Sequence, residues 1–113
     1  MAHTERLNAT LQQIRTHPET WDQQVYRDGN AGCFAFHAAL LAGAEINAPE
    51  DPGDDTLRCN EAARAHGFSN GERITIGDFA QCALELTLDE RLELFHPHRT
   101  LTDLERIVAE ISA

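Results

Sequence analysis

The segment from Ala31 to Gly43 most constrains what this chain folds into, because apolar residues occupy every side of the helix that it predicts. A helix that is apolar all round is stable only where other elements cover it on every side. We therefore expect a central buried helix over about residues 31–42, started by Asn30 and ended by Gly43.

The remaining segments predict short helices that surround this centre. Leu7, Leu11 and Ile14 form an apolar stripe on a first helix that ends before Pro18. Thr75, with an aspartate three residues later, favours a helix start over the brief strand-like pattern around it. The predicted fold is all-α: a compact array of five or six short helices in a single domain of residues 1–113. Further helices are expected over residues 56–66 and 88–96, and from Thr100 or Thr102 to the end of the chain. A short helix over residues 19–26 is an additional option.

Charge limits the classes of partner. The 113 residues include nineteen acidic and nine basic residues, for a formal net charge of −10, and every basic residue is an arginine. This field repels phosphates and anionic lipids, so we expect neither direct nucleic-acid binding nor membrane binding. The absence of lysine leaves no side-chain amine for Schiff-base chemistry. No stretch is apolar enough for a membrane span and the first residues lack a secretory pattern, which predicts a cytoplasmic protein.

Residues 45–55 predict an exposed acidic loop, since prolines and a glycine interrupt any regular element there. The order of its carboxylates does not match a calcium-binding loop. One interpretation is a solvated loop. Another is a row of charges that mimics DNA phosphates and occupies the basic groove of a DNA-binding protein. The acidic surface consists of Glu45, Glu50, Asp51, Asp54 and Asp55.

Cys33 and His37 lie four residues apart on the predicted central helix and therefore share a face. A thiol beside an imidazole is the pattern of a nucleophile with its base, or of two metal ligands. Core packing is the competing interpretation, and we favour it because free cysteine is among the most buried residue types. The paired spacings of a zinc site and the motifs of hydrolases are missing, so we assign no catalytic residue, metal or cofactor.

A resemblance to a known group concentrates at residues 17–23, His-Pro-Glu-Thr-Trp-Asp-Gln, and at residues 33–39 and 41–43, Cys-Phe-Ala-Phe-His-Ala-Ala and Leu-Ala-Gly. These stretches resemble small uncharacterised proteins of actinobacteria and of their phages and plasmids. The relatives tend to carry glycine and then tryptophan or histidine where this chain has Phe36 and His37. The resemblance implies an actinobacterial or phage setting and transfers no activity.

These features favour a small non-enzymatic interaction or accessory protein that uses its acidic surface to bind an unidentified protein, with a basic protein as the expected target. The sequence is also compatible with a homodimer. The alternative is a ligand-binding or thiol-dependent enzyme domain, centred on Trp21, Asp22, Cys33 and His37. The full set of candidate ligand or interface residues is Trp21, Asp22, Gln23, Cys33 and His37.

Overall fold

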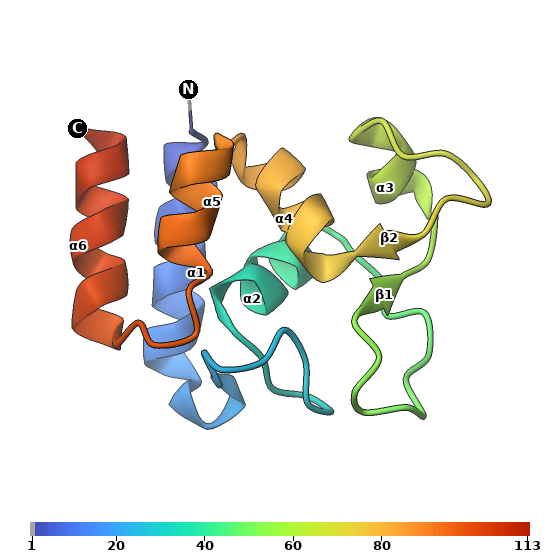
Figure 1. Cartoon of the computed structure of the whole chain (residues 1–113), viewed down its shortest axis with the longest axis horizontal. Helices are drawn as coiled ribbons and strands as arrows, with labels where there is room; N and C mark the ends of the chain where they lie inside the picture. Colours follow the sequence, from blue (N-terminus) through green and yellow to red (C-terminus); the bar gives the residue numbers. More distant parts are fainter. Residues whose placement is uncertain (1) are drawn as a thin grey trace.

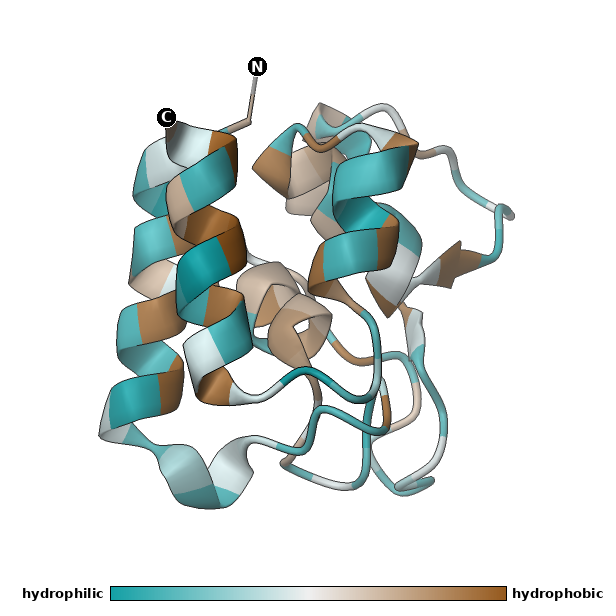
Figure 2. Ribbon diagram, turned by 60° about the vertical axis from the view of Figure 1, so that its left-hand side comes forward, coloured by the Kyte–Doolittle hydropathy of each residue, from teal (hydrophilic) through white to brown (hydrophobic). Residues whose placement is uncertain are grey.

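In the computed structural model, which describes residues 2–113, helix α2 (Phe34–Leu41) runs through the centre of the molecule (Figure 1). Residues 34–39 are all buried, and α2 packs against α1 (Thr4–Thr16) and α4 (Ile76–Leu84). Figure 2 shows α2 as apolar along its length, whereas the outer helices alternate between apolar and polar faces. The expected start at Asn30 is wrong, because residues 31 and 32 are extended and form bridges to the preceding loop.

The other helices form a layer around this centre. Helices α5 (Leu88–Leu94) and α6 (Leu101–Ser112) pack against each other, and α6 also lies along α1. The core of the molecule lies between α1, α2 and α4. Among residues 2–113, no helix is long and apolar enough to cross a membrane. Three helices begin at a threonine whose side chain accepts a bond from a backbone amide three residues later: Thr75, Thr87 and Thr100.

The chain is mostly helical rather than strictly all-α, because a two-stranded sheet replaces the start of one predicted helix. Strand β1 (Thr56–Leu57) pairs antiparallel with β2 (Ile74–Thr75), with Thr56 opposite Thr75 and Leu57 opposite Ile74. The helix expected over residues 56–66 is reduced to α3 (Glu61–Ala65). Asn60 sets this later start, since its side chain accepts a hydrogen bond from the Ala63 amide.

The helix expected over residues 19–26 is also wrong. Only a single 3-10 turn, η1 (Pro18–Thr20), forms there, and the chain is irregular from Trp21 to residue 33. Asp22 and Gln23 use their side chains to bind backbone groups, which competes with helix formation. This irregular segment positions the candidate site.

Candidate functional site

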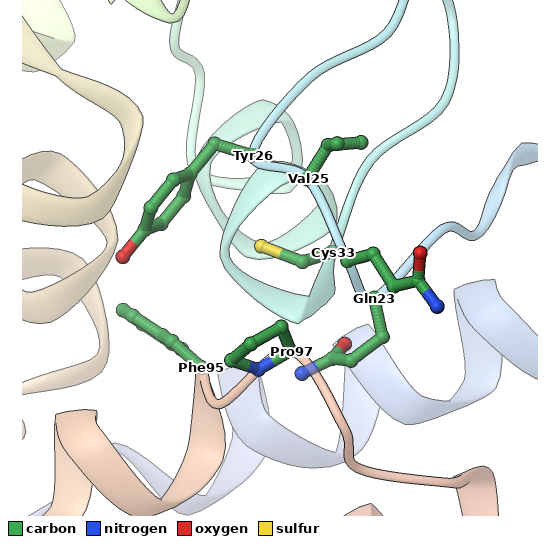
Figure 3. Close-up of a pocket in the computed structure, with 7 residues that line it drawn as sticks. Gln23, Val25, Tyr26, Cys33, Phe95 and Pro97 are labelled. Atoms are coloured by element: carbon green, nitrogen blue, oxygen red, sulfur yellow. The ribbon is translucent and has the colours of Figure 1, made fainter.

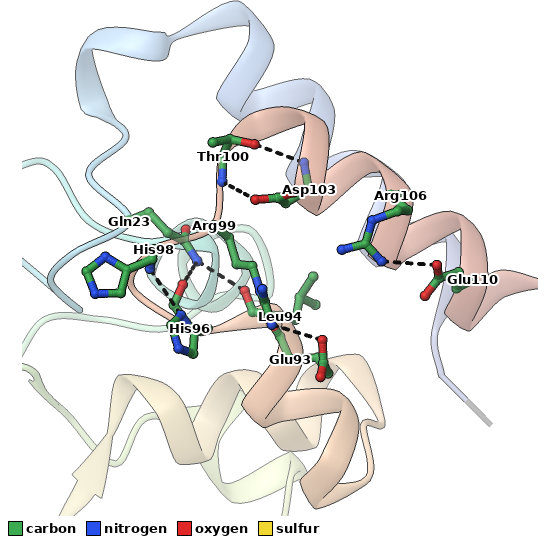
Figure 4. A network of polar contacts seen from close by, with 10 residues as sticks. All are labelled: Gln23, Glu93, Leu94, His96, His98, Arg99, Thr100, Asp103, Arg106 and Glu110. Carbon is green, nitrogen blue, oxygen red and sulfur yellow. Dashed lines mark hydrogen bonds and ion pairs between the residues drawn. The ribbon is translucent and has the colours of Figure 1, made fainter.

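Gln23 is a buried amide whose oxygen and nitrogen each make two hydrogen bonds. Its Oε1 accepts from the indole Nε1 of Trp21 at 3.0 Å and from the backbone amide of Phe34 at 3.1 Å. Its Nε2 donates to the carbonyl oxygens of Leu94 and His96 at 3.1 and 3.0 Å (Figure 4). We call these five residues the Gln23 network. Two donors face the amide oxygen and two carbonyls face the amide nitrogen. If the oxygen and nitrogen of Gln23 exchanged places, none of these four partners would be satisfied.

The Gln23 network caps two helices with one side chain. Phe34 is the first residue of α2 and Leu94 is the last of α5, so the amide of the first and the carbonyl of the second lack helical partners. Cys33, the N-cap residue of α2, makes no capping bond with its own side chain. Gln23 therefore supplies, from outside the helix, an acceptor for the first of the amides that have no partner within α2.

A cavity of about 150 Å³ opens beside this network. Cys33 lies at its base, and the sulfur points towards the space between Tyr26 and Phe95 (Figure 3). Val25 and Pro97 complete the apolar part of the wall. The cavity thus lies where the irregular segment before α2 meets the turn that follows α5.

A second hollow of about 210 Å³ adjoins the first on the α5 side and shares three of its lining residues. Leu92 and Arg91 belong to the second hollow alone. We call the two hollows together the Cys33 groove. Its lining consists of Val25, Tyr26, Cys33, Leu92, Phe95 and Pro97, together with the polar residues Gln23, Gln24, Arg91 and His96.

Arg91 is fixed at one side of the Cys33 groove. Its Nη1 donates to the Asp78 carboxylate and to Gln81, both at 2.8 Å, and a Cβ added to Gly77 would lie 2.7 Å from its Nη2. Burial by itself lowers the pKa of Arg91, but hydrogen bonds to Asp78 and to the Tyr26 hydroxyl raise it overall. The guanidinium therefore stays charged, and its charge is compensated within the protein.

The Cys33 thiol is not arranged as a nucleophile. Burial raises its pKa, and the backbone amides of Phe36 and Ala35 offset this effect only in part. The residues that line its cavity include no histidine or carboxylate that would accept its proton. Nor do three histidine, cysteine or acidic side chains converge as metal ligands anywhere in residues 2–113.

His37 lies apart from the groove. Its ring packs edge-on against Phe36, and its Nε2 is 2.9 Å from the carbonyl oxygen of Thr20. Burial lowers the pKa of His37, so the neutral ring donates its Nε2 proton to that carbonyl. The expected shared face with Cys33 does not form, because Cys33 is the N-cap residue and lies before the first helical turn.

Asp22, another candidate site residue, forms hydrogen bonds within the irregular segment that precedes α2. Asp22 accepts a hydrogen bond from the Gln24 amide at 3.1 Å, and its own amide donates to the Gly32 carbonyl at 2.9 Å. The side chain of Asp22 thus closes a turn through one carboxylate oxygen. Of the five predicted site residues, the structure brings three together around the start of α2: Trp21, Gln23 and Cys33.

The acidic loop is built around the buried guanidinium of Arg27. Its Nη1 donates to the carbonyl oxygens of Asp51 and Asp54 at 2.6 and 2.8 Å, and its Nη2 donates to that of Pro49 at 3.1 Å. Further bonds from Arg27 reach the carbonyls of Gly29 and Ala48. We call residues 47–55 with Arg27 the Arg27 loop.

The five acidic side chains predicted as a surface have different local roles. Asp54 accepts bonds from the side chain and the amide of Thr56, which lower the pKa of the carboxyl. Asp51 accepts a bond from a backbone amide two residues later, and Asp55 lies 3.8 Å from Arg73. Within the described residues, the carboxylates of Glu45 and Glu50 make no hydrogen bond or ion pair, and both residues are exposed.

Sequence reasoning missed Arg27, Arg91, Leu92, Phe95 and Pro97 as parts of these sites. Arg27 carries a weak signal, since it is a basic residue in a turn that precedes the acidic loop. The other four lie near residue 95, far along the chain from Cys33, and no local pattern relates the two segments.

Comparisons with protein-family models, with curated proteins and with solved structures found no match.

Proposed function

We propose that this chain is a non-enzymatic protein-interaction protein that binds a basic protein through its acidic surface, in an actinobacterium or one of its phages. The observation that carries the proposal is the distribution of charge. The setting rests on the sequence resemblance at residues 17–43.

Most of the positive charge is held by internal contacts. In the part of the chain that the structure describes, eight of the nine arginines place the guanidinium in a hydrogen bond or ion pair, and Arg58 is the exception. Among the described residues, six ion pairs, one of them between His17 and Glu19, engage only six of the nineteen acidic residues. The surface therefore offers an excess of negative charge, which favours encounter with a positively charged protein.

The geometry of the acidic loop also supports binding without catalysis. Arg27 binds five backbone carbonyls of the surrounding chain, so the exposed carboxylate of Glu50 extends from an ordered backbone. The backbone of Glu45 is fixed separately, because its carbonyl accepts a bond from the Arg58 amide. An ordered loop loses less conformational entropy on binding than a flexible one. The neutral, buried Cys33 thiol gives no corresponding support to a thiol-dependent enzyme.

Affinity capture from an actinobacterial lysate tests the proposal. The immobilised protein should retain a basic protein that is released by salt, because screening weakens attraction between exposed charges. Neutralising the loop should reduce this retention at least about tenfold, which corresponds to about 1.4 kcal/mol of binding free energy. The loop variant combines Glu45→Gln, Glu50→Gln and Asp51→Asn.

A matched control removes the same amount of charge at exposed positions elsewhere. It combines Glu5→Gln, Glu61→Gln and Glu85→Gln. Equal retention by the loop variant and the control, or a captured protein that is acidic and stays bound in salt, contradicts the proposal. If the captured protein binds DNA and DNA displaces it, the acidic surface acts as a mimic of phosphates.

A further inference from the structure

Two leucines on the outer face of α5 are more exposed than the large hydrophobic residues elsewhere in the described chain. Leu88 and Leu92 are 62% and 60% exposed and lie four residues apart, so they share a face of the helix. Leu92 also lines the Cys33 groove, where Val25 is 37% exposed. The exposed leucines thus continue into the hollow.

The Cys33 groove is shaped to receive an apolar side chain. Its cavity of about 150 Å³ has a base formed by Cys33 and walls formed by Phe95 and Pro97. Water occupies about 30 Å³ per molecule in the liquid, so an apolar group that enters this space displaces several waters. Displacement of water by an apolar group that fits such a site increases affinity.

The charges beside this apolar surface that have no ion-pair partner among the described residues are negative. Asp89 lies on α5 within a turn of Leu92, and Asp22 is the residue before Gln23, which lines the cavity. Neither aspartate makes an ion pair among the described residues. The nearby arginines do not offset them, because Arg91 is paired with Asp78. Arg99 is likewise paired with Glu93.

The exposed leucines and the neighbouring carboxylates favour one kind of binding partner for the Cys33 groove over another. A second copy of the chain would bring the acidic α5 against another acidic α5, and the like charges would repel. An amphipathic segment with an apolar face and basic flanks matches both the leucines and the carboxylates.

We propose that the Cys33 groove and the exposed leucines of α5 form the docking site for an amphipathic basic segment of the partner protein, an inference that rests on the proposed function. One apolar side chain of this segment enters the cavity above Cys33. Neighbouring apolar residues cover Leu88 and Leu92, and lysine or arginine side chains contact Asp22 and Asp89.

A defined peptide tests this site on the full chain. The probe is a synthetic amphipathic helical peptide of leucine and lysine, and its control has glutamine in place of every leucine. In a titration followed by amide NMR shifts, the leucine peptide should shift residues that line the groove, such as Val25, Tyr26 and Phe95. The control peptide should leave these amides unchanged, because the site needs an apolar side chain.

Two leucine variants sharpen the titration. Leu92→Gln should weaken binding of the leucine peptide about tenfold, since it removes apolar surface at the groove. Leu41→Gln is the matched control, because Leu41 is 51% exposed at the end of α2 and lies outside the groove. Both residues are exposed, so neither substitution should change the thermal midpoint appreciably.

Three outcomes overturn the docking site. The first is equal binding of both peptides with shifts confined to the Arg27 loop, a result that leaves the proposed function standing. The second is the same loss of affinity in Leu92→Gln and Leu41→Gln. The third is no shift with the leucine peptide, in which case the lysate capture still decides the proposed function separately.

Discussion

Gln23 and Arg27 lie four residues apart in the irregular segment before α2, and each organises backbone that lacks regular structure. Gln23 is neutral, accepts two bonds and donates two, and its partners include carbonyls 71 and 73 residues away. Arg27 is charged, only donates, and reaches no further than 27 residues along the chain. One side chain therefore joins distant helices, whereas the other closes a single loop.

The difference in reach predicts a difference in what each residue stabilises. Loss of Gln23 leaves polar groups unpaired at the start of α2 and the end of α5, both of which pack into the core. Loss of Arg27 frees carbonyls of an exposed loop, and water can reach them when the loop opens. We expect the first effect to be global and the second to be mainly local.

Gln23→Met should give the largest effect. It keeps the length of the side chain and removes both polar atoms, so the Phe34 amide and the carbonyls of Leu94 and His96 lose their partner. Unpaired buried groups cost about 1–3 kcal/mol each, so we expect the free energy of unfolding to fall by about 4 kcal/mol. Urea denaturation followed by circular dichroism measures this loss.

Gln24→Met is the matched control for this substitution. Gln24 is the next residue and is exposed, and its side chain makes no hydrogen bond with the described residues. Its replacement should change the free energy of unfolding by less than about 0.5 kcal/mol. Similar losses in both variants would show that the network does not hold the two helices together.

Local patterns in the sequence predicted the parts of the fold that local interactions determine. The helix start predicted at Thr75 is confirmed, and of the two starts left open for the last helix the structure has Thr100, because each side chain accepts a bond from an amide only three residues away. The apolar segment around residues 34–39 likewise indicates burial by its composition alone. These signals lie within one or two turns of helix and need no knowledge of the tertiary structure.

The candidate site was less predictable, because its contacts are not local. Cys33 and His37 share a face only if the helix starts before residue 33, and the extended backbone at Gly32 delays that start. A Cβ at Gly32 would collide with the Tyr26 carbonyl and with Phe36, so the chain crosses here only with glycine. The link from Gln23 to the end of α5 has no counterpart in any short window of sequence.

Arg27→Met should give a smaller and more local effect. The carbonyls of the loop lose a charged donor but can bind water when the loop opens, so we expect a loss of about 2 kcal/mol. The amide of Gly29, which donates to Pro52, should exchange with solvent faster, while the amides of α2 keep their protection. Hydrogen exchange measured by NMR separates these two responses.

Arg58→Met is the matched control for Arg27→Met, because it also removes one positive charge. In the described residues the Arg58 guanidinium has no hydrogen-bond or ion-pair partner, and the residue is exposed. The substitution should leave the exchange rate of the Gly29 amide unchanged. A uniform increase in exchange across α2 in Arg27→Met would instead mean that the Arg27 loop stabilises the whole fold.

The smallest expected effect is a difference in how low pH changes stability through the Gln23 network and through the Arg27 loop. Burial lowers the pKa of His37 below its ordinary value of 6.5, so the unfolded chain binds this proton first and stability falls as the pH decreases below 6.5. His37 bonds to Thr20, close to the Gln23 network. In the Arg27 loop, bonds from Thr56 lower the pKa of Asp54 below 3.8, so its contribution is present above 3.8 and is lost as the pH falls through the lower, folded value.

Two pH windows follow from these directions. Between the ordinary values of 6.5 and 3.8, the thermal midpoint should fall with decreasing pH, and His37→Gln should reduce the slope while Asp54→Asn leaves it unchanged. The slope should not vanish in His37→Gln, because burial also lowers the pKa of His66. If Asp54→Asn changes the slope in this window as much as His37→Gln does, acid acts on both regions together and the separation between them is wrong.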